Sequence, residues 1–126
     1  MIIIGHPWIK SNHFFKVFSI KGIEKSQGND IILLEPLVDS HVYAEHCQAN
    51  AIPFAVVVNT LDDALYANAL GAKYIICEED DALMIQPIAN EYLFDARILV
   101  HIHSEKEISK IARGHIDGVI FSEAIR

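Results

Sequence analysis

Short apolar runs alternate with amphipathic segments along most of this chain, a pattern typical of strands that alternate with helices. The apolar runs predict strands at residues 2–4, 14–18, 31–34, 54–58, 73–77, 97–103 and 119–121. The segments between them predict helices at residues 20–26, 61–70, 82–93 and 105–113, and a further helix that ends near residue 49. Asp39 or Ser40 is expected to cap this last helix.

Residues 55–121 contain two strand–helix–strand units that match each other without a gap. His103 follows Asn59 by 44 positions, and Ser104 follows Thr60 by the same interval. In each unit an acidic residue stands three positions after the hydroxyl residue, which is the capping-box pattern of a helix start. Each helix is then followed by a glycine and another apolar strand.

Strands that alternate with helices indicate a parallel sheet, because parallel neighbours need a long crossover connection. Right-handed crossovers allow either an open sheet with helices on both faces or part of a barrel. A complete eightfold barrel needs about 200 residues or more, and this chain has 126. We therefore predict a single α/β domain over residues 1–126, a three-layer sandwich of Rossmann- or flavodoxin-like type with a mainly parallel sheet.

The composition narrows the class of partner and the compartment. The net charge is −7 and lysine and arginine form no cluster, so we expect no binding to nucleic acid. No apolar run approaches the roughly 20 residues that cross a bilayer, and the N-terminus lacks the pattern of a signal peptide. Cys47 and Cys77 show no metal-binding spacing and suggest free thiols. We predict a cytoplasmic protein with no membrane contact.

Polar residues follow five successive strands at the points where those strands end. Ligands of open parallel sheets bind in the crevice beyond the carboxyl ends of the strands. The residues predicted to bind a small molecule there are Glu35, Asn59, Thr60, Glu78, His103, Ser104 and Ser122. The alternative is that these positions are polar because loops are solvated and helices need caps, a role that Thr60 and Ser104 can fill. The pattern names no ligand and calls for no cofactor.

His101 and His103 form the sharpest local signal. Alternate residues of a strand share a face, so both imidazoles are expected to point the same way. Such a pair can bind a divalent metal, and Glu35 or Glu78 could complete the ligand set. This arrangement would suit a metal-dependent or phosphate-handling hydrolase, whereas a chance His-X-His pair in a chain with seven histidines is the alternative.

Three smaller features have both a functional and a structural interpretation. His41 and Glu45 stand four apart on one helix and can pair, or simply form a solvated helix face. Trp8 lies in an irregular segment, where it can line a pocket or anchor the segment by packing. The acidic residues 78–81 can hold Mg²⁺ or favour a helix start through the helix dipole.

One stretch resembles a known family. The sequence Ala-Val-Val-Val-Asn at 55–59 leads into a helix that ends in Leu70-Gly71-Ala72, and after the strand to residue 76 come Glu78 and Glu79. Residues 29–93 thereby resemble the second half of nucleotide-binding domains that regulate potassium transport, the TrkA-N or RCK type. The resemblance implies a Rossmann-like fold and a self-associating role.

The first strand departs from that family. The family binds nucleotide at a glycine-rich turn after its first strand, whereas Gly5-His6-Pro7-Trp8 stands there in this chain. No nucleotide-binding residue therefore carries over. Residues 116–120, Ile-Asp-Gly-Val-Ile, look instead like the last unit of phosphate-binding barrels.

Together these features predict a small cytoplasmic domain with a ligand-binding or regulatory role that forms a homodimer. The motive for the dimer is the high apolar content with the aromatic segment 92–94, Trp8, and Phe14 with Phe15. The alternative is the hydrolase built on His101 and His103. A third possibility is a protein-interaction subunit without a small-molecule site.

Overall fold

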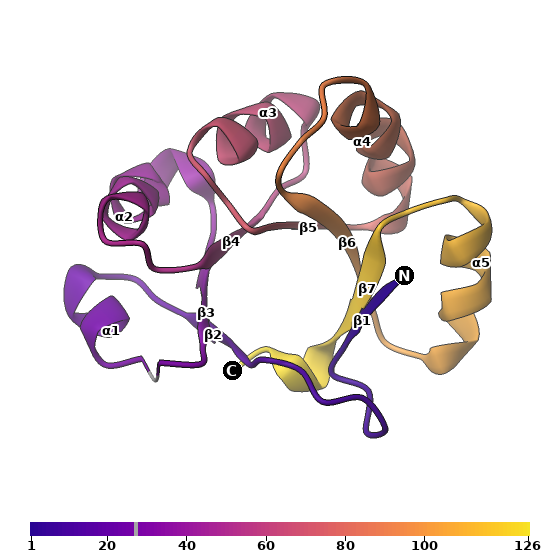
Figure 1. Cartoon of the computed structure of the whole chain (residues 1–126), viewed down its shortest axis with the longest axis horizontal. Coiled ribbons are helices and arrows are strands. Elements are labelled where there is room, and N and C mark those ends of the chain that lie inside the picture. Colours follow the sequence, from indigo (N-terminus) through magenta and orange to yellow (C-terminus); the bar gives the residue numbers. More distant parts are fainter. Residues whose placement is uncertain (27) are drawn as a thin grey trace.

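Seven parallel strands form the centre of the molecule (Figure 1). The computed structural model describes residues 1–26 and 28–126. The strands are β1 (Ile2–Ile4), β2 (Phe14–Lys16), β3 (Ile31–Leu34), β4 (Phe54–Val57), β5 (Tyr74–Cys77), β6 (Arg97–Ile102) and β7 (Gly118–Phe121). Their order in the sheet is β1-β7-β6-β5-β4-β3-β2, and all six pairings are parallel.

Helices connect the strands and lie around the outside of the curled sheet (Figure 1). They are α1 (Ile20–Glu24), α2 (Leu37–Ala49), α3 (Leu61–Ala69), α4 (Glu79–Glu91) and α5 (Ile108–Arg113), with short 3₁₀ helices η1 (Glu105–Glu107) and η2 (Ser122–Ala124). None of the helices in the described part of the chain has the length and apolar content needed to cross a membrane.

The predicted α/β class with a parallel sheet, consistent with a Rossmann- or flavodoxin-like fold, is confirmed. From β2 to β7 the strands lie in chain order, so each crossover steps in the same direction. Right-handed crossovers that all step one way place their helices on one face of the sheet. The opposite face is then free to curl inward, which gives the arrangement anticipated as part of a barrel.

The C-terminal residues bring the two edges of the curled sheet together. Ile125 forms a parallel bridge with Phe14 of β2. The backbone N–H of Arg126 donates to the carbonyl of Phe14 over 2.8 Å, and the N–H of Lys16 donates to the carbonyl of Arg126 over 3.2 Å. The first 16 residues thus join the sheet, with β1 against β7 and β2 against β3.

Alternation of side chains along the strands divides the core into two clusters. The larger cluster packs the outer face of the sheet against the helices, where Ala44, Ala64 and Ile85 are buried. The smaller cluster fills the inside of the curled sheet; its buried members are Ile4, Phe14, Ile31, Leu33, Ala55, Ile76, Leu99, Ile120 and Ala124. Because both faces of the strands are buried, the strands are apolar at successive positions.

Two of the three capping predictions given above are confirmed. The Thr60 hydroxyl accepts from the N–H of Asp63, and Ser104 forms the predicted capping box with Glu107. The expected cap at Asp39 or Ser40 is wrong, because α2 already begins at Leu37 after Pro36. Proline suits a helix start since its fixed φ is pre-set for it. The Ser40 hydroxyl donates instead to the Pro36 carbonyl.

Two aromatic positions differ from expectation. Trp8 does not anchor its segment, because 89% of its surface is exposed. Phe14 is fully buried inside the curled sheet. It therefore cannot contribute to an association surface, and the expectation that it does is wrong. Tyr92 and Leu93 are exposed as that expectation requires. The strand at 14–18 was correctly located, but the burial of its first aromatic depends on closure of the sheet.

Gly118 should be intolerant of even one added methyl group. A Cβ at this position would lie 2.4 Å from the carbonyl oxygen of Ile2 and 2.9 Å from a methyl of Leu99. Gly118→Ala should lower the free energy of unfolding by about 1–3 kcal/mol, because it forces β1 away from β7. Urea unfolding followed by circular dichroism measures this. Gly28→Ala, with no atom within 4 Å, is the matched control; equal loss in both variants would contradict the prediction.

Candidate functional site

A polar layer lies above the apolar filling of the curled sheet, at the carboxyl ends of its strands. In each of six strands a polar residue stands two positions after an inward-facing apolar one, so the alternation continues onto the same inner side. These pairs are Phe14 and Lys16, Leu33 and Glu35, Val57 and Asn59, Ile76 and Glu78, Leu99 and His101, and Ile120 and Ser122.

A cavity of about 320 Å³ opens at this end of the sheet. We call it the mouth cavity. Its lining residues are Lys16, Leu33, Glu35, Val57, Val58, Asn59, Ile76, Cys77, Glu78, Asp81, His101 and Ile125. Apolar side chains of β3, β4 and β5, with Val58 and Ile125, form part of its wall. Polar side chains of β2 and β6, of the residues that follow β3, β4 and β5, and of α4 form the rest. The lining therefore offers both apolar contact and directional hydrogen bonds.

The structure brings only some of the predicted site residues together. Glu35, Asn59 and Glu78 line the mouth cavity. Thr60 and Ser104 do not line it; each instead caps the helix that follows, as the alternative interpretation held. The remaining two predicted residues, His103 and Ser122, lie beside the cavity and connect to it through His101.

His101, Ser122 and His103 form a hydrogen-bonded cluster at the edge of the mouth cavity. The Ser122 Oγ lies 2.8 Å from Nε2 of His101 and 3.2 Å from Nδ1 of His103. The two imidazole centroids are 4.8 Å apart. Both rings therefore point to the same side, as predicted. The hydroxyl of Ser122, the residue that follows β7, lies between them.

Acidic groups outnumber basic ones around the mouth cavity. Lys16 Nζ pairs with Glu35 Oε1 over 3.3 Å, while Glu78 and Asp81 carry further carboxylates. Burial raises the pKa of the Cys77 thiol to about 12, and the charges of Asp81 and Glu78 add to the effect. The thiol is therefore neutral and unreactive at neutral pH, and the cavity has a negative potential on that side.

Several charged groups act on His101. Burial is the main cause that lowers its pKa, and His103 and Lys16 lower it further. Glu78 and Glu107 act in the opposite direction. The net lowering keeps the imidazole neutral near pH 7.

Among residues 1–26 and 28–126, no group of three or more His, Cys, Asp or Glu side chains is arranged to hold a metal ion. Neither Glu35 nor Glu78 completes a ligand set with the two histidines in this conformation. Glu35 is held by Lys16 instead, at 3.3 Å.

His6 gives a second contact at the same end of the sheet. Its Nε2 lies 2.5 Å from Oε1 of Glu105, and its ring packs edge-on against Phe121. This contact joins the segment after β1 to η1. His6 is buried, whereas its neighbour Trp8 projects outward. The packing of this segment therefore depends on His6 and does not place Trp8 in a pocket.

Sequence reasoning missed Lys16, Asp81 and Ile125 as lining residues. Lys16 was assigned to the middle of a strand at 14–18, but β2 ends there. Asp81 belongs to the acidic run 78–81, for which the sequence predicts a Mg²⁺ site or a helix start and no place in a cavity for a small molecule. Side-chain alternation along the strand would have placed Lys16 on the same inner side as Phe14, two positions earlier. Ile125 reaches the cavity through its bridge to Phe14 of β2, which the sequence does not indicate.

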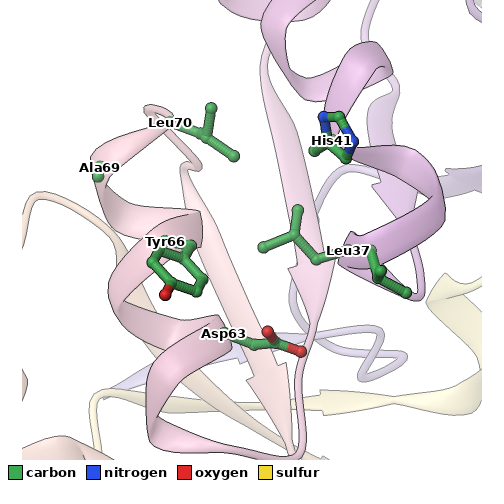
Figure 2. Close-up of a pocket in the computed structure, with 7 residues that line it drawn as sticks. Leu37, His41, Asp63, Tyr66, Ala69 and Leu70 are labelled. Atoms are coloured by element: carbon green, nitrogen blue, oxygen red, sulfur yellow. The ribbon is translucent and has the colours of Figure 1, made fainter.

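A separate apolar groove of about 480 Å³ lies between α2 and α3 (Figure 2). Its lining residues are Leu37, Val38, His41, Asp63, Tyr66, Ala69 and Leu70. His41 lies 3.9 Å from Glu45, so the predicted pair exists on an exposed helix face. We call this feature the α2–α3 groove.

Comparison with known proteins assigns no family. No model of a protein family matches this sequence, and a search of curated proteins finds no match.

The protein should lose stability as the pH falls through the range where His101 takes up a proton. Because its pKa is lowered from 6.5 in the folded state, the unfolded chain binds that proton more readily. Neutral His101 therefore makes its full contribution to the free energy of unfolding at pH values above the pKa of the unfolded chain. That contribution is lost as the pH falls below this pKa. Unfolding midpoints measured between about pH 8 and 5 should decline less steeply for His101→Gln than for the wild type.

His115→Asn is the matched control for this pH series, since it removes an exposed histidine in the turn before β7 and asparagine tolerates the positive φ there. Its unfolding midpoints should follow those of the wild type. A slope for His101→Gln that equals the wild-type slope would show that His101 is not the group responsible.

Proposed function

We propose that this chain is a ligand-binding domain that holds a small polar molecule in the mouth cavity. The observation that supports this most directly is that polar side chains in or directly after five strands line one cavity, above an apolar interior. Ligands of parallel sheets bind at this same end.

The lining indicates the kind of molecule. A volume near 320 Å³ suits a metabolite with few heavy atoms. Lys16 and Asn59 offer N–H donors, while Glu35, Glu78 and Asp81 offer acceptors. A molecule with several hydroxyl, carbonyl or amino groups matches these better than an apolar one. Such binding fits the ligand-binding or regulatory role predicted from the sequence.

The thiols support the proposed cytoplasmic location. Cys47 and Cys77 are both free and buried, and burial raises the pKa of Cys47 to about 11. Buried free thiols of this kind persist in a reducing compartment.

A thermal-shift screen of tag-free protein tests ligand binding. The panel consists of nucleotides, sugar phosphates, small polyols and hydroxyketones, and divalent ions. A ligand at a hundredfold its dissociation constant should stabilise the protein by about 2.7 kcal/mol. Asn59→Leu and Glu78→Gln should each abolish that shift, because both residues line the cavity.

Asp62→Asn is the matched control, because it removes an exposed charge on α3 outside the cavity. It should leave the ligand shift intact. Shifts that survive both Asn59→Leu and Glu78→Gln would place the ligand elsewhere and contradict the proposal.

The proximity of His101 and His103, with centroids 4.8 Å apart, favours the metal-dependent or phosphate-handling hydrolase as a second candidate. Metal analysis of the same tag-free sample decides it. Stoichiometric metal that His103→Ala removes, with the fold retained, would favour this hydrolase over a metal-free binding domain.

We further propose that the protein forms a homodimer through the α2–α3 groove (Figure 2). Val38 and Tyr66, on its two sides, are 76% and 60% exposed. Exposed apolar side chains that lie together on one surface are typical of a protein–protein contact. The groove also has a histidine, His41, on one side and an acid, Asp63, on the other. Around a two-fold axis His41 of one copy can face Asp63 of the second, so the surface is complementary to itself.

Sedimentation equilibrium of the wild type should give the dimer mass at micromolar concentration. Val38→Glu with Tyr66→Glu should give the monomer mass, because both place negative charge in the apolar contact, where the two copies would then repel each other. Tyr92→Lys, on the exposed turn after α4, is the control and should remain dimeric. A monomeric wild type would refute self-association.

A further inference from the structure

The Ser122 hydroxyl is placed between two imidazoles in a way that a structural role does not explain. Its Oγ lies 2.8 Å from His101 Nε2 and 3.2 Å from His103 Nδ1. Ser122 begins η2, yet its side chain does not cap that helix. Within the described part of the chain, its hydrogen bonds are therefore those to the two histidines.

The hydrogen-bond chemistry of the cluster permits two arrangements. A hydroxyl has one proton, so it can donate to one neutral imidazole and must accept from the other. In the first arrangement His101 donates through Nε2–H and Ser122 donates to Nδ1 of His103. In the second, His103 donates through Nδ1–H and Ser122 donates to Nε2 of His101. Conversion of the first into the second moves both hydrogen-bond protons, and it also requires a proton to enter at Nδ1 of His101 and another to leave from Nε2 of His103.

The two ends of the cluster differ in their surroundings. His101 is half-buried and lines the mouth cavity, and its Nδ1 has no hydrogen-bond partner among the described residues. His103 is exposed and does not line the cavity. A proton that enters at one end can therefore leave at the other.

We propose that His101, Ser122 and His103 relay a proton between a molecule bound in the mouth cavity and solvent. His101 Nδ1 takes a proton from the bound molecule, and His101 Nε2–H passes to Ser122 Oγ. The Ser122 proton passes to His103 Nδ1, and His103 releases its Nε2 proton to water. All three side chains are neutral before and after, and the reverse sequence returns a proton to the molecule.

This inference deepens the proposed binding function and rests on it, since it names the chemistry of the bound molecule. Protons on oxygen and nitrogen exchange with water unaided, so a relay matters for a proton on carbon. A C–H next to a carbonyl is the class of weak acid that a neutral imidazole can deprotonate in a site. The C–H pair of electrons then forms an enolate whose oxygen needs N–H donors, and Lys16 and Asn59 line the same cavity.

The charges that face His101 suit such a base. Lys16 comes from β2, Glu78 follows β5 and Glu107 lies in η1, while His103 follows on the same strand. The resulting neutral ring has a free lone pair when its Nε2 carries the proton. The relay thus begins in the state that accepts a proton from the cavity.

The ring tautomers provide a test that needs no ligand. In both arrangements the two histidines have the same tautomer, either both Nε2–H or both Nδ1–H. Long-range ¹H–¹⁵N spectra of ¹⁵N-labelled, metal-free protein at about pH 8 read each tautomer directly. Matching tautomers, or equal averages in exchange, are expected. Opposite tautomers would show that Ser122 does not connect the rings and would overturn the relay.

Deuterium exchange into hydroxyacetone tests the chemistry. In D₂O the wild type should speed the loss of the C–H signals next to the carbonyl, as followed by proton NMR. Ser122→Ala should slow this exchange at least tenfold, since general acid–base groups contribute about 10²–10⁴. Ser122→Thr keeps the hydroxyl and should retain most of the rate, and His115→Asn, which changes an exposed turn residue, should retain all of it.

Equal exchange rates for wild type and Ser122→Ala, or no acceleration by the wild type, would overturn the proposed chemistry. The binding function is judged separately, by the thermal shifts of Asn59→Leu and Glu78→Gln. Stoichiometric zinc on His101 and His103 in untreated protein would also overturn the relay, because the metal would occupy the nitrogens that carry the proton.

Discussion

The curling of one parallel sheet is the constraint on which the rest of this structure depends. Because the strands from β2 to β7 follow one another in chain order, all crossovers step one way and the helices cover one face. The uncovered face must bury its own apolar side chains by closing on itself. The short bridge from Ile125 to Phe14 completes that closure between the edges. Without it, the inner apolar cluster would face water.

Closure also creates the candidate site. Inside the curled sheet, alternate side chains of neighbouring strands meet, and the same alternation continues beyond the last apolar residue of each strand. The polar residues that follow, such as Glu35, Asn59 and Glu78, then face one another across the mouth cavity. The architecture that produces a dry interior thereby produces a polar site above it, and the cluster around Ser122 borders that site.

Local sequence features were sufficient to predict most of the elements and several of their ends. Short continuous apolar runs and capping pairs act over a few residues, so Thr60 and Ser104 could be assigned as caps before the fold was known. The start of α2 could not, because Pro36 competes with Asp39 and Ser40 and only the packing of Leu37 against the sheet decides between them. Burial of Phe14 and exposure of Trp8 likewise depend on which surfaces meet.

The sequence by itself determined the α/β class, the places of the strands and the end of the sheet where polar residues gather. These follow from backbone periodicity and hydrogen bonding, which are local. Only the tertiary structure decided that Lys16 and Ile125 border the cavity and that Ser122 bridges His101 and His103. Ser122 lies 19 residues from His103, and such contacts depend on strand order and on the degree of curling. Those properties are set by how all the crossovers pack together.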